Sequence, residues 1–314
     1  MHCSMVTGLI EMSVFPLSVV FFGNNLEVLE CLDSVSNIVA VFTRPDDGSN
    51  ENVNSIKKFS AFSGIPVFQP SKKELYDHAD FLQKADPDII IVCGYKFIIP
   101  KEIFSIPRNG TINIHPSMLP RYRGQHVINW AIVNGELETG VTLHFMEETL
   151  DTGDIIVQKS VPICFEDTAK ELHDRIYKEA CCLLKELLKY YNKQDKLQGK
   201  KQDSSVATFF KPRKPEDGHI DWSKSSVEIY NLIRALSKPW PGAFSYFKNH
   251  KVVIWKAHIE PDLSEISHGK LINVDDDYIS VSTIDGQIII TEYEIISADK
   301  TIKSILLKNG DFFT

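Results

Sequence analysis

Amide, imidazole, hydroxyl and guanidinium side chains gather between Asn113 and Arg123, directly after an apolar run. Asn113 and His115 are two residues apart at the end of a predicted strand, so their side chains point to the same face. Pro116 and Pro120 follow and hold the exit from the strand rigid. An amide can donate to a developing oxyanion and an imidazole can move a proton, so the pair suits acyl transfer. Alternatively, Asn113 caps a turn and His115 is a hydrogen-bonded core residue.

A second polar stretch, "LDTGD", lies between two apolar runs and contains Asp151. A carboxylate in a glycine-containing loop can reach an imidazole and hold its tautomer. The same letters are also typical of a tight Asx turn. The combination of this stretch with "NIHPS" and "GVT" upstream favours a carboxylate that orients the imidazole over a simple turn.

The elements that would position these residues follow from the hydrophobic pattern. Short apolar runs alternate with helical patterns through the first part of the chain, which predicts an α/β fold with a mostly parallel sheet. Residues 23–25 read "GNN" and lack the GxGxxG fingerprint, which argues against a classical NAD enzyme. Strands are expected at 17–23, 37–43, 65–70, 87–95 and 110–116, and helices at 24–35 and 72–85.

The predicted elements continue to a polar linker, and the hydrophobic pattern changes only after it. A helix is expected at 126–136, two antiparallel-type strands at 139–146 and 153–163, and a long amphipathic helix at 168–191. A helix at 225–236 and short strands with Gly, Asn and Asp turns then predict a small, OB-like β-barrel domain. We therefore expect an N-terminal extension at 1–16, a catalytic domain at 17–191, a linker at 192–205 and a β domain at 206–314.

Composition restricts the class of protein. The chain has 314 residues, 43% hydrophobic and 24% charged, with a net charge of −8, which makes a nucleic-acid partner unexpected. The six cysteines form no CxxC or Cys/His ligand spacing, so we expect a reducing, cytoplasmic location and no metal. No run reaches the ~20 apolar residues of a membrane span. Glu11 and the missing basic region argue against a signal peptide.

From about Leu17 to Tyr190 the sequence resembles the folate-dependent formyltransferases. The resemblance rests on "NIHPSMLPRYRG", "NWAIVNGE", "TGVTLHFM" and "LDTGD". It implies a Rossmann-like formyltransferase fold, Asn113, His115 and Asp151 as a catalytic triad, and 10-formyltetrahydrofolate as the formyl donor. The loop "GYKFIIP" corresponds to the family's donor loop, although by itself it is an ordinary strand-to-helix turn. The implied donor contacts are Tyr95, Phe97, Ile98, Ile99, Pro100 and Glu148.

The mechanism expected from this resemblance is the attack of a neutral primary amine on the formyl carbon. Asn113 and protonated His115 stabilise the oxyanion, and His115 assists proton movement towards N10 of the donor. Asp151 orients His115 and favours its charged form. Acceptor contacts are expected from residues soon after the catalytic strand: Ser117, Arg121, Arg123, Gly124, Gln125 and His126.

The nature of the amine is indicated by the second domain. "PWPGAFSY" is particularly similar to UDP-4-amino-4-deoxy-L-arabinose formyltransferases, which implies a nucleotide-linked amino sugar and lipopolysaccharide biosynthesis. Where those enzymes usually have a small residue and a proline, this chain has Gln125 and His126, so the identity of the sugar stays open. Methionyl-tRNA formyltransferase is the alternative; a formyl-tetrahydrofolate hydrolase and a silent folate-binding module are less favoured. We expect no membrane partner and leave a homodimer open.

Overall fold

The structure is a computed structural model that describes residues 17–46, 48, 50–191, 197–261, 268–296 and 307–314. The chain divides into two compact units, Met1–Thr111 with Leu184–Lys196, and Ile112–Leu183 with Leu197–Thr314. The predicted extension at 1–16 and the first part of the predicted linker at 192–205 lie outside the described residues. The domain limits given above stay a prediction.

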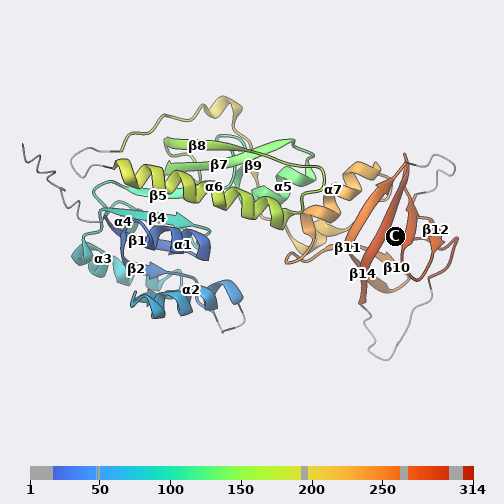
Figure 1. The fold of residues 1–314 in the computed structure, drawn as a ribbon, viewed down its shortest axis with the longest axis horizontal. Helices are drawn as coiled ribbons and strands as arrows, with labels where there is room; N and C mark the ends of the chain where they lie inside the picture. The colour runs from blue at the N-terminus through green and yellow to red at the C-terminus, as the bar shows by residue number, and fades with distance from the viewer. Residues whose placement is uncertain (1–16, 47, 49, 192–196, 262–267, 297–306) are drawn as a thin grey trace, which may run out of the picture. The chain divides into compact units, whose positions relative to one another are not determined.

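The first unit alternates strands and helices, and its strands are all parallel. Their order in the sheet is β3-β2-β1-β4. Figure 1 shows β2, β1 and β4 next to one another in this order. The fully buried rings of Phe22 and Phe42 stack 4.4 Å apart between neighbouring strands. The elements are β1 (Ser18–Gly23), α1 (Leu26–Asp33), β2 (Asn37–Phe42), α2 (Glu51–Phe62), β3 (Val67–Phe68), the 3-10 helix η1 (Glu74–His78), α3 (Ala79–Ala85), β4 (Ile89–Cys93) and α4 (Lys101–Phe104).

The second unit begins with an antiparallel arrangement. Strand β7 pairs with β5 on one side and with β8 on the other. The antiparallel pairing of β7 with β8 agrees with the sequence prediction. Two-residue strands β6 and β9 pair in parallel and connect the turn after β5 to residues near 210. The elements here are β5 (Thr111–His115), β6 (Arg123–Gly124), α5 (Val127–Val133), β7 (Glu138–Phe145), β8 (Ile155–Pro162), α6 (Ala169–Tyr190), the 3-10 helix η2 (Ser204–Val206) and β9 (Phe209–Phe210).

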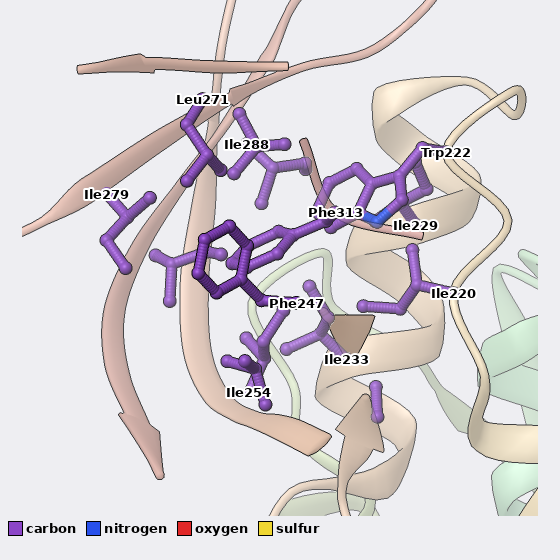
Figure 2. Close-up of a cluster of buried hydrophobic side chains, with 14 of the residues drawn as sticks. Ile220, Trp222, Ile229, Ile233, Phe247, Ile254, Leu271, Ile279, Ile288 and Phe313 are labelled. Atoms are coloured by element: carbon purple, nitrogen blue, oxygen red, sulfur yellow. The ribbon is translucent and has the colours of Figure 1, made fainter. Parts of the chain in front are cut away.

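The C-terminal part is a five-stranded antiparallel sheet with helix α7 against it (Figure 1). Ser225 and Glu228 form a reciprocal capping box that starts α7. Ile229 and Ile233 of α7 pack in one core cluster with Trp222, Phe247 and strand residues (Figure 2). The strand order is β10-β11-β14-β13-β12. The elements are the 3-10 helix η3 (Pro215–Gly218), α7 (Ser226–Leu236), β10 (Ala243–Phe247), β11 (His250–Glu260), β12 (Leu271–Val274), β13 (Ile279–Ser282) and β14 (Gln287–Ile296).

The predicted fold class is confirmed: a parallel α/β sheet is followed by a separate antiparallel β domain. Within the described ranges, no helix combines the length and the apolar character needed to cross a membrane.

Candidate active site

Strand β5 and its partner β7 bring two polar pairs to the same place in the second unit. In the antiparallel register Asn113 lies opposite His144, and His115 lies opposite Thr142. Opposed residues of an antiparallel pair have side chains within direct reach of each other. Residues 31 apart in the chain therefore become neighbours at the end of β5.

The Asn113 amide and the His144 ring form a hydrogen bond with a defined direction. Asn113 Nδ2 lies 3.1 Å from His144 Nε2, and His144 Nδ1 lies 2.8 Å from the carbonyl oxygen of Phe145. A carbonyl only accepts, so Nδ1 carries the proton and Nε2 accepts from the amide. Burial above all, followed by the charge of nearby His115, lowers the pKa of His144 to about 4. His144 is thus a neutral acceptor that fixes which way the Asn113 amide points.

The His115 ring is held between a main-chain carbonyl and a carboxylate. It is 4% exposed, and its Nε2 donates to the carbonyl oxygen of Tyr122 at 2.7 Å. Its Nδ1 lies 3.6 Å from Asp151 Oδ1, an ion-pair distance longer than a hydrogen bond. The same carboxylate oxygen lies 3.8 Å from His144 Nε2. The three predicted triad residues and His144 therefore form one cluster, in which Asn113 is half-buried and the other three are buried.

Asp151 reaches this cluster because the loop after β7 is tightly folded. Its backbone adopts the left-handed region with φ of 56°, and its Oδ2 accepts the Gly124 main-chain N–H at 2.9 Å. Gln202 Nε2 donates to the carbonyl oxygens of Asp151 and Gly153. A Cβ at Gly153 would lie 1.8 Å from the Phe145 oxygen. The glycine of "LDTGD" is required by this close approach, which explains the motif sterically.

The turn between β5 and β6 is fixed by polar groups from neighbouring elements. The buried Ser117 hydroxyl donates to the carbonyl oxygens of Arg121 and Tyr122. Thr142 donates to the Ser117 carbonyl at 2.6 Å, and Gln158 donates to Thr142. The Tyr122 carbonyl that holds His115 is thereby kept in place.

The remaining predicted acceptor residues are placed differently from one another. Arg121 is half exposed and forms an ion pair with Glu136 at 2.7 Å. Arg123 donates to Gln202 Oε1, so it supports the Asp151 loop. Gln125 has an exposed side chain, and His126 lines a cavity. Direct acceptor contacts of these residues stay a prediction.

The predicted donor loop follows β4 in the first unit. Ile98 is 72% exposed, whereas Ile99 is buried. The hydroxyl of Tyr95 is buried and has no hydrogen-bond partner among the described residues. The contacts of this loop with the donor stay a prediction. Glu148 is exposed in the segment between β7 and β8, in the second unit.

A metal site finds no support in the described part of the chain, where no three His, Cys, Asp or Glu side chains are grouped as ligands.

Comparison with known families identifies the class of enzyme. A protein-family model described as formyl transferase matches residues 20–188, and a second family model, the formyl transferase C-terminal domain, matches residues 213–305. The chain belongs to the formyl transferase family. The predicted class, a folate-dependent one-carbon transferase that uses 10-formyltetrahydrofolate, is confirmed at this level.

Proteins similar to this formyltransferase include a tRNA enzyme, a polymyxin resistance protein and an enzyme complexed with an amino-sugar nucleotide. The chain is 38% identical over 288 residues to a methionyl-tRNA formyltransferase of Alkaliphilus oremlandii, covering 89% of this chain and 91% of that protein. It is also 38% identical over 285 residues to the bifunctional polymyxin resistance protein ArnA of Wigglesworthia glossinidia brevipalpis, covering 90% of this chain and 42% of ArnA. The structure of an N-formyltransferase from Helicobacter canadensis, complexed with folinic acid and dTDP-3-aminofucose, has 23% identity and a TM-score of 0.68. That match covers 89% of this chain and all of the other, and supports the fold.

Sequence reasoning missed His144, a member of the cluster, and Gln202, which supports the Asp151 loop. His144 stands inside "TGVTLHFM", and a polar aromatic residue in an apolar strand was the available signal. Gln202 lies in a polar segment without a pattern, so only the folded chain reveals its contact with the Asp151 loop.

Proposed function

We propose that this formyltransferase transfers the formyl group of 10-formyltetrahydrofolate to the primary amine of a nucleotide-linked amino sugar. The observation that carries the chemistry is the cluster of Asn113, His115, His144 and Asp151, with its defined hydrogen-bond directions. The product would be a formylated amino sugar of the kind used in lipopolysaccharide biosynthesis.

Asn113 and His115 would supply the donors for the oxyanion that develops as the amine adds to the formyl carbon. One Asn113 N–H is bonded to His144, which leaves the second N–H of the same amide for the reacting oxygen. Such a donor works best when it is oriented before the reaction begins. His144, neutral and fixed by Phe145, provides that orientation.

His115 would move the proton. The amine loses one proton as the new C–N bond forms, and N10 of the donor gains one as its bond to the formyl carbon breaks. His115 donates Nε2–H to the Tyr122 carbonyl here, so proton delivery requires that the ring exchange this carbonyl for the reacting group. Asp151 at 3.6 Å favours the imidazolium form during that exchange.

The acceptor is assigned from charge and from relatives. A net charge of −8 suits a small anionic substrate bound at a local site better than a long polyanion that needs a broad basic surface. The similar fold of the Helicobacter canadensis N-formyltransferase, which is complexed with dTDP-3-aminofucose, is compatible with a nucleotide sugar. Methionyl-tRNA is the second candidate, because the Alkaliphilus enzyme has the same identity over nearly its full length.

One screen separates these acceptors. The purified enzyme is incubated with 10-formyltetrahydrofolate and, in parallel, with UDP- and dTDP-linked amino sugars or with methionyl-tRNA. Product mass is then examined for an added formyl group. Formylation of a nucleotide sugar supports the proposal, and formylation of methionyl-tRNA alone contradicts it. Release of formate without any acceptor would indicate a hydrolase, and donor binding without turnover would indicate a silent folate-binding module.

A further inference from the structure

A cavity of about 220 Å³ lies within the second unit where three segments meet. The segments are the start of α5, residues 213–218 and the turn after α7. Asn129 of α5 donates to the Ala235 carbonyl of α7 at 2.6 Å, which ties two of the three walls together. Pockets that take a whole drug-sized ligand measure about 300–1,000 Å³. This cavity is therefore sized for one part of a larger substrate.

Arg213 lines the cavity with a guanidinium group that is only partly hydrogen-bonded among the described residues. Its guanidinium lies over the Trp130 ring, with Cζ 4.4 Å from the ring centroid, and its Nη2 donates to the Asp217 carbonyl at 2.6 Å. Its Nε and Nη1 are buried and have no hydrogen-bond partner among the described residues. A guanidinium stays charged in proteins, so these donors favour an oxygen acceptor that the described chain does not supply.

His126 adds a neutral donor beside Arg213. Its Nδ1 accepts the main-chain N–H of Arg213 at 2.9 Å, so the ring proton lies on Nε2. Burial, followed by the Arg213 charge, lowers the pKa of His126, which disfavours the charged ring. Lys214 also lines the cavity, and no carboxylate side chain is among its lining residues. The polar part of the cavity is thus rich in donors, which suits an anionic oxygen group.

The rest of the wall is apolar and includes Leu236, Trp240 and Pro241. A flat or hydrophobic surface next to charged donors is complementary to a ligand with a ring attached to an anion. A nucleotide has this composition, since its phosphates are bonded to ribose and a planar base.

We propose that this cavity binds a phosphate group of the acceptor nucleotide, with Arg213 and His126 donating to its oxygens and the apolar wall contacting the adjoining ring. The proposal rests on the proposed function, since it names the part of the nucleotide-linked acceptor that is held here. The cavity is a binding site, and the residues that perform the reaction are those of the Asn113 cluster.

The test compares Arg213→Gln with the wild type by calorimetric titration of UDP and dTDP. Loss of charge-assisted hydrogen bonds should weaken binding by about tenfold to a hundredfold. Lys256→Gln, which removes a positive charge from an exposed position on β11, is the matched control and should bind like the wild type. Arg213→Lys keeps the charge and should recover part of the affinity. With an accepted amino-sugar nucleotide, Arg213→Gln should raise KM while kcat at saturation stays near the wild-type value.

Thermal melting and circular dichroism establish that each variant is folded. If Arg213→Gln melts far below the wild type, His126→Asn tests the same site and should weaken binding several-fold. Wild-type affinity in a folded Arg213→Gln, or no binding of either diphosphate by the wild type, would overturn the phosphate site. Loss of diphosphate binding in the variant, together with no formylation of any sugar by the wild type, would leave the site intact and refute the proposed function instead.

Discussion

At the scale of single residues, His115 is expected to be the main proton carrier. His115→Asn keeps a polar side chain and removes the imidazole, so turnover should fall by about two to four decades, the usual effect of losing a general acid or base. Single-turnover kinetics with a saturating donor would measure the chemical step. Near-normal turnover in a folded variant would exclude His115 from proton transfer.

His144 is expected to act through Asn113. In His144→Gln the side-chain carbonyl can still accept the Asn113 amide, whereas His144→Phe leaves that amide unoriented. We expect kcat to fall by up to about a hundredfold in the phenylalanine variant, because one oxyanion donor is misplaced. The glutamine variant should retain most of the activity. Equal losses in both variants would mean that the imidazole has a direct chemical role.

The lowered pKa of His144 also predicts how stability depends on pH. The unfolded ring titrates near pH 6.5 and the folded ring near 4, so the unfolded state binds more protons between these values. The contribution of His144 to the free energy of unfolding is fully present above about pH 6.5. It falls by roughly 3 kcal/mol as the pH decreases towards 4. Urea unfolding at several pH values should show a smaller loss for His144→Gln than for the wild type. Parallel curves would show that His144 does not cause the dependence.

At the scale of elements, the loop that carries Asp151 depends on a close backbone approach. Gly153→Ala places a methyl group 1.8 Å from the Phe145 oxygen, so the loop or β7 must move. We expect a loss of roughly 2 kcal/mol in the free energy of unfolding, together with lower turnover, as Asp151 shifts from His115. Gly286→Ala is the comparison, because its backbone has no positive φ and its Cβ would come no closer than 3.0 Å to a neighbouring atom, so it should lose less stability. Similar behaviour of the two variants would argue against the steric explanation.

The start of α5 restricts how acceptor specificity can be tested. His126 has φ of 55°, whereas proline is confined to φ near −65°. Replacing Gln125 and His126 with the small residue and proline of the amino-arabinose enzymes would therefore distort the backbone before it altered recognition. Gln125→Ala and His126→Asn are better suited, since asparagine tolerates the left-handed region. A role of the pair in choosing the sugar stays a prediction.

At the scale of the whole molecule, charge separates the two acceptors. A nucleotide diphosphate releases few counterions on binding, so kcat/KM for a nucleotide sugar should change by less than about tenfold between 50 and 200 mM KCl. A tRNA acceptor bound through many phosphates would lose about a thousandfold or more over the same range. Measuring kcat/KM for the nucleotide sugar and for methionyl-tRNA at both salt concentrations and at matched enzyme concentration would distinguish the two acceptors. A steep salt dependence for the accepted substrate would contradict a small acceptor.

The sequence alone determined the alternation of strands and helices, the antiparallel pair at 139–146 and 153–163, and the change to a β domain. These follow from apolar periodicity, which local side-chain patterns encode directly. It also indicated Asn113, His115 and Asp151, because they stand next to strand ends in a specific motif.

Only the tertiary structure decided how these groups are oriented. Strand register placed His144 opposite Asn113. The left-handed backbone of Asp151 directs its side chain towards His115, and Gln202, 51 residues away in the chain, holds the Asp151 loop. The cavity around Arg213 likewise joins Asn129 to Ala235 across 106 residues. Such contacts depend on which surfaces pack together and on which buried donors find acceptors. The spacing of neighbouring residues encodes neither the packing of surfaces nor the pairing of buried donors, so only the tertiary structure defines them.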